Sequence, residues 1–202
     1  MRARQVVLAG HGAEPSEVVA DALEDEDPEL RARAVSAAHR LGHRSEPERV
    51  RSLRDPSALV RRRACEIEAR APAPSPVVDA ALIACLDDDD ALVVVAAADA
   101  LGESEARSAT DALAQVAVGH DDPRCREAAV AALGSIGDQT GLDAVLAALS
   151  DKPAVRRRAV VALAGFEGPE VEAGIDAALG DRDWQVRQAA EALRAGDEPK
   201  PT

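Results

Sequence analysis

A short motif returns along this chain about every 31 residues, and it constrains the fold more than any other feature. Each copy has an acidic turn, an apolar anchor residue, an arginine directly after the anchor and an alanine three positions beyond the arginine. The third copy differs, because Val94 stands where the others have arginine. The regular spacing predicts six tandem copies of one structural unit, with anchors at Leu30, Val60, Val93, Cys125, Val155 and Val186.

Within each copy, apolar residues follow the spacing of a helix face. Val155, Ala159 and Leu163 stand at positions i, i+4 and i+8, and the other copies repeat the pattern. A second helix precedes each of these, and residues such as Ser75 and Thr140 are expected to cap it. A helix pair buries its apolar face only against its neighbours, so the pairs should stack. We therefore predict an all-α fold, an α-α superhelix (α-solenoid) of about six two-helix repeats.

We expect residues 1–195 to form a single solenoid that unfolds as one cooperative unit. Residues 2–9 are expected to form an N-terminal capping helix, and residues 196–202 a disordered tail. Glycines after the second helix of a copy are expected to end it: Gly42, Gly102, Gly134 and Gly165. The predicted repeats span about 14–44, 45–72, 75–103, 106–137, 140–166 and 168–195.

Composition narrows the function. The net charge of −13 opposes nucleic-acid binding, so a nucleic-acid partner is not expected. No apolar run is long enough to span a membrane, and we expect no membrane association. The three cysteines are scattered and odd in number, which indicates small buried residues in a reducing compartment and a cytoplasmic location. Aromatic residues make up only 1% of the chain, whereas ligand pockets are usually lined by aromatic walls.

The motif Asp-Pro-x-Val-Arg-x-x-Ala-x-x-Ala-Leu-Gly resembles the HEAT-like repeats of the phycobilisome-lyase type, a class with many short bacterial members. Residues 122–134 and 181–193 match best, and the resemblance covers about 14–195. It implies a right-handed HEAT-like solenoid. It also implies a ladder in which turn aspartates bond to early arginines along the stack, here Asp27, Asp55, Asp122, Asp151 and Asp181 with Arg31, Arg61, Arg126, Arg156 and Arg187.

Candidate chemical sites are weak. The resemblance extends to deoxyhypusine hydroxylase, which binds di-iron through His-Glu pairs, but this chain has no His-Glu dipeptide. His39 and His43 have a metal-ligand spacing, although Gly42 lies between them. The run at 87–90 lacks the glycine and distal glutamate of an EF-hand loop. No motif for a nucleophile or for phosphate binding occurs. We expect no catalytic residues, no cofactor and no metal, and hence no enzymatic activity.

Two arginine triplets, 61–63 and 156–158, could contact phosphates. Structural use in the repeat is the stronger interpretation. Trp184, the one tryptophan, precedes the last helix and is expected to pack under the turn as a C-terminal cap.

The second helix of each repeat is expected to line the concave side. If the core takes the anchor and positions 4, 7 and 8 after it, positions 2 and 6 point about 200–240° away. The helix at 92–98 is apolar nearly all round, so it is either buried on every side or held against a partner. The predicted partner-binding residues are Arg62, Glu66, Val95, Asp99, Glu127, Ala131, Arg157, Val161 and Gln188; Ala32 and Ser36 hold the same positions in the first repeat.

The sequence therefore favours a non-enzymatic scaffold that binds a protein or peptide partner on its concave face. The partner is expected across repeats three to five, with Val95, Ala131 and Val161 in apolar contact and Arg62 and Arg157 pairing with acidic groups. Equally, these valines could pack against flanking helices. Two other functions stay open: an enzyme or enzyme subunit of the HEAT-like lyase class, such as a tetrapyrrole lyase or its chaperone, and nucleic-acid binding.

Overall fold

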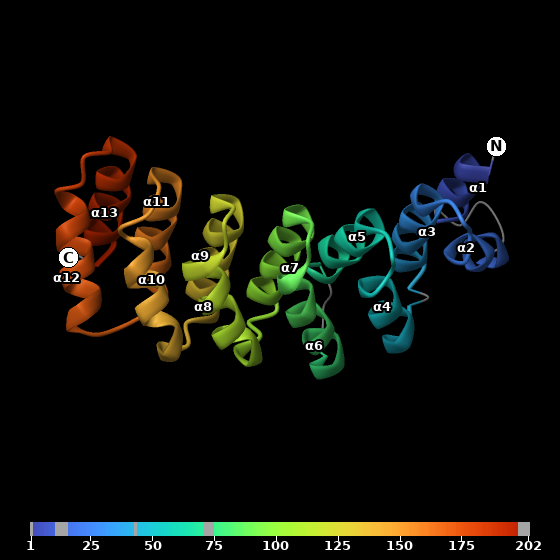
Figure 1. Ribbon diagram of the computed structural model, residues 1–202, viewed down its shortest axis with the longest axis horizontal. Coiled ribbons are helices and arrows are strands. Elements are labelled where there is room, and N and C mark those ends of the chain that lie inside the picture. Colours follow the sequence, from blue (N-terminus) through green and yellow to red (C-terminus); the bar gives the residue numbers. More distant parts are fainter. Residues whose placement is uncertain (1, 11–15, 43, 71–74, 198–202) are drawn as a thin grey trace, which may run out of the picture. The chain divides into compact units, whose positions relative to one another are not determined.

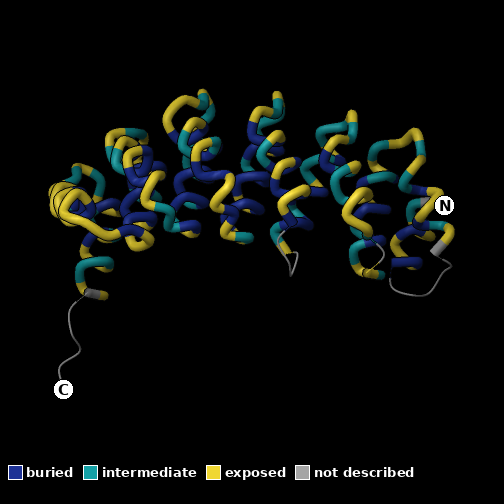
Figure 2. Tube along the Cα trace, turned by 90° about the horizontal axis from the view of Figure 1, so that it is seen from below, coloured by how far each residue is buried: buried dark blue, intermediate teal, exposed yellow. Residues whose placement is uncertain are grey.

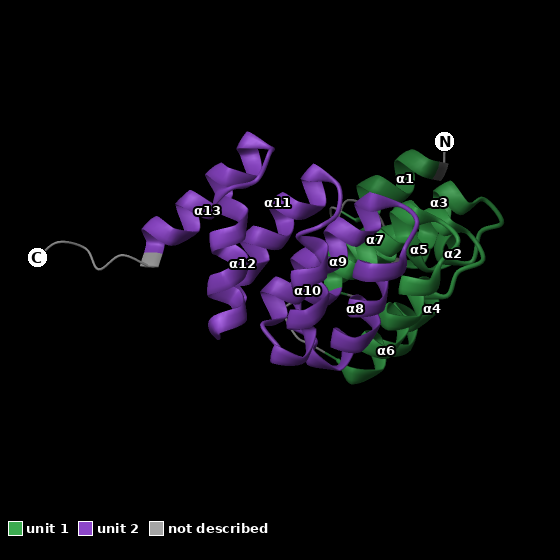
Figure 3. Ribbon diagram, turned by 60° about the vertical axis from the view of Figure 1, so that its left-hand side comes forward, with its two compact units in different colours: residues 1–100 green, residues 101–202 purple. Residues whose placement is uncertain are grey.

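The computed structural model describes residues 2–10, 16–42, 44–70 and 75–197 (Figure 1). Within these ranges the regular elements are all helices. The chain divides into two compact units, residues 1–100 and 101–202, which are treated separately below (Figure 3). The expected disordered tail begins too early, because Gly196 is still helical. Residues 198–202 of that tail lie outside the described residues.

Unit 1 begins with the predicted capping helix, α1 (Arg2–Ala9), which packs against α2 and α3. Helix pairs follow, in which we call the first member the A helix and the second the B helix. α3 packs on α5, and α4 packs on α6, so like helices of successive pairs are neighbours. The pairs are α2 (Ser16–Leu23) with α3 (Pro28–Arg40), α4 (Glu46–Leu53) with α5 (Ala58–Glu68), and α6 (Pro76–Ala84), a short 3-10 turn (Cys85–Asp87) and α7 (Ala91–Glu103).

Unit 2 contains the end of α7 and three further pairs. Its B helices α9, α11 and α13 pack successively on one another, and α8 packs on α10. Short 3-10 segments lie at Arg107–Ala109, Gln139–Gly141 and Leu163–Gly165. The pairs are α8 (Thr110–Gly119) with α9 (Pro123–Ile136), α10 (Leu142–Ala148) with α11 (Pro153–Ala162), and α12 (Pro169–Leu179) with α13 (Trp184–Asp197).

Local sequence explains where these helices begin. The carboxylate of Asp27 accepts a hydrogen bond from the backbone N–H of Glu29, and Pro28 takes the first helical position. Asp122 caps α9 in the same way. The hydroxyl of Ser75 accepts from the N–H of Val78, as predicted. Thr140 does not cap a helix. It lies within the 3-10 turn Gln139–Gly141, and its hydroxyl donates to Asp138, which caps that turn.

The core of each unit is built from the repeat anchors and the alanines beside them. The six anchors are 0–6% exposed, and buried residues recur along every B helix (Figure 2). Cys65, Cys85 and Cys125 are buried, which agrees with their interpretation as small core residues. Trp184 contradicts its prediction: it is 61% exposed at the start of α13.

Two predicted helix-ending glycines are wrong. Gly102 and Gly134 lie inside α7 and α9, where a Cβ would stand 2.9 Å from Cα of Ala132 and 2.7 Å from Cα of Ala162. They are glycine because the next B helix comes that close. Gly42 does follow the end of α3, with φ of +69°, and Gly137 ends α9 with φ of +61°.

Candidate functional site

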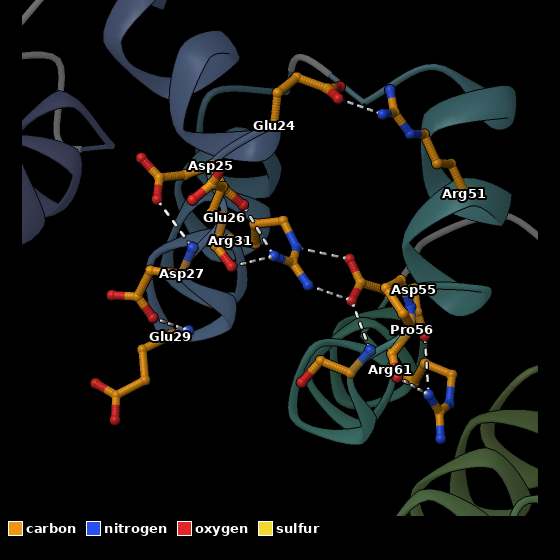
Figure 4. Close-up of polar contacts among 11 residues, drawn as sticks. Glu24, Asp25, Glu26, Asp27, Glu29, Arg31, Arg51, Asp55, Pro56 and Arg61 are labelled. Atoms are coloured by element: carbon orange, nitrogen blue, oxygen red, sulfur yellow. Dashed lines mark hydrogen bonds and ion pairs between the residues drawn. The ribbon is translucent and has the colours of Figure 1, made fainter.

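Arginines at the start of the B helices reach from one repeat to the next. Arg31 donates from Nε and Nη2 to the two carboxylate oxygens of Asp55, at 2.9 and 2.7 Å (Figure 4). The partners are half-buried, with side chains 14% and 13% exposed. We call each such bidentate contact a rung. Unit 1 contains Arg31–Asp55 and Arg61–Asp88, and unit 2 contains Arg126–Asp151 and Arg156–Asp181.

The same guanidinium groups also bind their own repeat. Nη1 of Arg31 donates to the carbonyl oxygens of Asp25 and Glu26, and Nη1 of Arg61 donates to those of Asp55 and Pro56 (Figure 4). One arginine therefore satisfies backbone acceptors in its own turn while it holds the carboxylate of the following repeat.

The predicted ladder is correct for the arginines, except that Arg187 reaches only the carbonyl oxygen of Asp181 in its own turn. It is wrong for two aspartates. Asp27 and Asp122 cap helices instead, because they stand two residues too late in the turn. In the third repeat, Asp88 accepts the rung from Arg61 of the second repeat. The third repeat has Val94 in place of the arginine that would donate to the fourth repeat.

At the turn position of Asp55 and Asp88, the fourth repeat has His120. Its Nδ1 accepts the N–H of Asp122, as the carboxylate of Asp88 accepts the N–H of Asp90. The third repeat thus lacks the arginine of a rung, and the fourth lacks the carboxylate.

The rungs lower the pKa of their carboxyl groups. For Asp151 and Asp181 the hydrogen bond from the arginine is the largest influence, and it brings the pKa below its ordinary value. For Asp55 and Asp88 burial acts most strongly and would raise the pKa. The arginine hydrogen bonds, a backbone N–H and the positive charge together outweigh burial, so the pKa is again lowered.

The three arginines of each triplet have different roles. The first arginine of each, Arg61 or Arg156, is committed to a rung. The second and third point to the surface: side chains of Arg62 and Arg63 are 36% and 45% exposed. In the first triplet a structural arginine is thus followed by two partly exposed arginines that pair with Glu66 on the same helix.

The predicted binding residues all lie at the surface of the B helices. Asp99, Val161 and Gln188 are exposed, and the other six are half-buried. In unit 2 the face is continuous between repeats, since Nη2 of Arg158 on α11 lies 3.7 Å from Glu127 on α9. Val95 belongs to unit 1, whereas Ala131 and Val161 belong to unit 2, so the face is described unit by unit.

Two details differ from the predicted face. Ala32 is buried at 6% exposure, within a small cluster that includes Val35 and Val60. In α7, Val94 is fully buried and Val95 is half-buried, while Leu92 is 41% exposed. The apolar helix is thus mostly core, with a limited apolar surface.

Unit 1 has a groove of about 380 Å³ on this face, across α1, α3 and α5. Ser36 and Arg62, both predicted inner-face residues, line it, and the buried Ala32 also contributes. Arg40 is fixed at one side by a hydrogen bond from Nε to the carbonyl oxygen of Gly10, at 3.2 Å. The full lining is Val7, Glu29, Ala32, Arg33, Ser36, Arg40, Leu59, Arg62 and Arg63.

Most of the other lining residues were not predicted. The predicted face comprised positions 2 and 6 after the anchor. The groove is also lined by the residue before the anchor, Glu29 or Leu59, and by position 3, Arg33 or Arg63. Position 3 is arginine in three repeats, at Arg33, Arg63 and Arg158, and that recurrence was the available signal. The contribution of α1 through Val7 required the tertiary structure.

A second cleft, of about 540 Å³, opens between α2 and α4 above α3 and α5. The Arg31–Asp55 rung and an ion pair between Glu24 and Arg51 lie at its edge (Figure 4). Its floor includes the buried valines Val35 and Val60. Beside this cleft, α4 contributes a single buried side chain, that of Leu53.

Arg44 also lines that cleft and belongs to a buried ion cluster. Glu68, whose side chain is 1% exposed, accepts from Arg44 at 3.0 Å and from Nη2 of Arg49 at 2.5 Å. Burial lowers the pKa of Arg44 despite this pairing. The cluster attaches the start of α4 to the end of α5.

In the part of the chain that the structure describes, no group of three or more His, Cys, Asp or Glu side chains is arranged to hold a metal ion. His43, one half of the His39–His43 pair, lies outside the described residues. Across the same described residues, no helix has the length and apolar character needed to cross a membrane.

Comparisons with known proteins agree with this architecture. Residues 78–164 match the family of HEAT repeats. No curated protein matches the sequence. A designed armadillo repeat protein in complex with the peptide (KR)4 is similar, with a TM-score of 0.65 and 15% identity over 91% of this chain and 99% of that chain.

Two natural proteins are also similar in fold. The phycocyanin lyase complex of CpcE and CpcF from Nostoc has a TM-score of 0.64 and 21% identity, covering 89% of this chain and 75% of that chain. Human deoxyhypusine hydroxylase has a TM-score of 0.52 and 21% identity, covering 96% and 78%. At these identities the likeness concerns the fold alone.

The fold defines the class: this is an all-α helical-repeat protein of the armadillo and HEAT type. The predicted fold class and the resemblance to HEAT-like repeats are confirmed.

Proposed function

We propose that this protein is a non-enzymatic scaffold that binds a protein or peptide partner on the exposed face of its B helices. The contact residues are those predicted from the repeat. In unit 1 they are Arg62, Glu66, Val95 and Asp99, and in unit 2 Glu127, Ala131, Arg157, Val161 and Gln188. A cytoplasmic location accompanies this proposal, since an odd number of scattered, buried cysteines suits a reducing compartment.

The observation that carries the proposal is the stripe of side chains that the B helices keep at the surface. Val161 is 51% exposed near the end of α11, one turn after the arginines of the same helix. In unit 1 the stripe borders the groove across α1, α3 and α5. A surface that mixes apolar side chains with arginine has the composition of a protein interface.

Relatives in fold support this use. The designed armadillo protein carries a bound peptide, and CpcE and CpcF form a complex with each other. Neither identifies a partner for this chain.

Affinity capture with matched variants tests the proposal. Val161→Asp places a charge on the B-helix face, whereas Val118→Asp places one on the A helix α8, at 63% exposure in the same unit. We expect partners identified by mass spectrometry to be lost with Val161→Asp and kept with Val118→Asp. Thermal melts of both variants should match the original chain, because both valines are exposed.

Equal retention by the two variants would refute a binding face on the B helices. A large fall in melting temperature for Val161→Asp would show instead that this valine is a core residue.

A further inference from the structure

We propose that the groove of unit 1 binds an acidic, extended peptide segment in which carboxylate residues are interspersed with apolar ones. This inference rests on the proposed function and adds the chemistry of the partner. The groove is the one across α1, α3 and α5, and we call it the arginine groove.

The charge of the arginine groove is opposite to that of the protein. The chain carries a net charge of −13, yet four arginines and one glutamate line this groove. A positive recess on a strongly acidic protein attracts acidic ligands locally, while the surrounding field repels large polyanions. The groove therefore selects for a short acidic segment.

The arginines of the groove are only partly neutralised. Arg33 has one contact with Glu29, at 3.2 Å, and both partners are largely exposed. Arg62 and Arg63 share Glu66, at 3.5 and 2.8 Å. Two carboxylates thus serve three guanidinium groups, and each guanidinium has five N–H donors.

Arg62 is the clearest unsatisfied donor. Its Nε is buried and has no hydrogen-bond partner, although Glu66 lies 3.5 Å away and the side chain as a whole is 36% exposed. A ligand carboxylate can bind two guanidinium donors side by side, an arrangement that arginine favours. Exposed ion pairs such as Arg33–Glu29 are weak, so an incoming carboxylate displaces them easily.

The spacing of the groove suits an extended chain. Arg33 lies on α3 and Arg62 on α5, and neighbouring helices are about 8–10 Å apart. An extended peptide advances about 3.3–3.6 Å per residue, so carboxylates two or three residues apart reach arginines of both helices. Val7 and Leu59, 43% and 37% exposed, offer apolar contact between them.

Single-stranded nucleic acid fits the same groove less well. Its bases need aromatic side chains on which to stack, and the groove lining contains none. Trp184, the one tryptophan of the chain, belongs to unit 2. A protein segment supplies both the carboxylates and the apolar side chains that the lining would meet.

Fluorescence anisotropy of the full chain tests the inference with three labelled probes. They are a peptide in which Glu alternates with Leu or Val, a peptide of Lys and Arg, and a short single-stranded oligonucleotide. We expect the acidic peptide to bind and the other two to bind at least about tenfold more weakly. The affinity should fall as salt rises from about 50 to about 200 mM, because the contacts are ionic and exposed.

Matched double variants locate the site. Arg62→Glu with Arg63→Glu should weaken the binding of the acidic peptide at least about tenfold. Arg107→Glu with Arg182→Glu changes two exposed arginines of unit 2 that do not line the groove, and it should change the affinity less than about threefold. Arg62→Gln with Arg63→Gln removes the charge without reversing it, and circular dichroism melts verify that each variant is folded.

The inference is overturned if no acidic peptide binds, if the oligonucleotide binds more tightly, or if both variant pairs lose affinity equally. If no acidic peptide binds while partner capture still depends on Val161, the peptide proposal is wrong and the proposed function stands. If capture is also independent of Val161, the proposed function fails.

Discussion

Arg126 and Asp151 show how one side chain joins two repeats. Arg126 donates to both carboxylate oxygens of Asp151, which lies 25 residues further along the chain. It also donates to the carbonyl oxygens of His120 and Asp121 in its own turn. Only the planar, five-donor guanidinium reaches all of these acceptors, so lysine is no substitute. The rung therefore helps to set how one repeat is placed on the next.

Asp151→Asn should lower the free energy of unfolding by about 2 kcal/mol at pH 7, because a half-buried arginine loses its charged acceptor. The pKa of Asp151 is lowered in the folded state, so its contribution is complete above the unfolded pKa of about 4 and is lost as pH falls through the folded pKa. Urea titrations at several pH values should show the two proteins converging in acid.

Asp121→Asn is the control for that measurement, because Asp121 is exposed and its side chain is not part of a rung. It should change stability by less than about 0.5 kcal/mol. A constant difference between Asp151→Asn and the original chain down to about pH 2 would contradict the assigned role of the carboxylate.

Replacing a helical glycine by alanine has opposite effects on stability, depending on whether another helix lies against the glycine. Gly134→Ala places a Cβ 2.7 Å from the backbone of Ala162, so we expect a loss of about 1–3 kcal/mol from overpacking. Gly119→Ala, at the end of α8, meets nothing within 4 Å and should be neutral or stabilising. Thermal melts of the two variants compare them directly. Equal stability for the two would show that α9 and α11 separate easily.

At the scale of the element, α4 is the least firmly packed A helix that the structure describes in unit 1. It buries one side chain, that of Leu53, and its start is held by the charges of Arg49 and Arg44 on Glu68. The ion cluster thus attaches α4 to its neighbour, whereas buried apolar side chains attach the other helices. Buried charges are costly when one partner is missing, so this attachment is vulnerable.

Glu68→Gln should destabilise unit 1 by about 3 kcal/mol, because it leaves two arginines beside a buried neutral group. Hydrogen exchange measured by mass spectrometry should show faster exchange in α4 and little change in α9. Glu66→Gln, on the same helix but 34% exposed, is the matched control and should leave the exchange of α4 unaltered. Similar exchange of α4 in both variants would argue against the ion cluster as its anchor.

The presence of the helices was largely predictable. Helices lie at residues 2–9 and within every predicted repeat, since helical spacing and caps such as Ser75 act within a few residues. The bounds of the repeats stay a prediction. Gly102 and Gly134 were misassigned for the opposite reason. A glycine that ends a helix and a glycine that admits a neighbouring helix look the same in sequence, and only the position of Ala132 or Ala162 distinguishes them.

At the scale of the whole molecule, the expectation of one cooperative solenoid over residues 1–195 stays a prediction. The chain divides into two compact units at residue 100, but α7 runs without interruption through that point. Repeat proteins are coupled through neighbouring repeats, so a continuous helix shared by both units favours joint unfolding.

Trp184 makes this prediction measurable, because it is the one tryptophan and lies in the last repeat. We expect tryptophan fluorescence and far-ultraviolet circular dichroism to report the same urea midpoint. Two separate transitions, with fluorescence following one of them, would mean that the units unfold independently.

The candidate site was partly predictable. Arg62 was placed on the surface of α5 from helical geometry alone, and the structure has it in the arginine groove. Arg40 was missed because its role depends on α1 lying beside α3. Arg33 was missed although arginine recurs at its position in three repeats. Val95 and Val161 were expected in a single site, but the structure describes each within its own unit.

By itself, the sequence determined the helical class, the number of repeats and the anchors. These follow from interactions between residues within a few turns of one helix. The tertiary structure alone decided that Asp88 accepts a rung, that Asp27 does not, and which arginines surround a common groove. Those outcomes depend on the placement of one repeat on another, where partners some 25 residues apart meet across a packed interface.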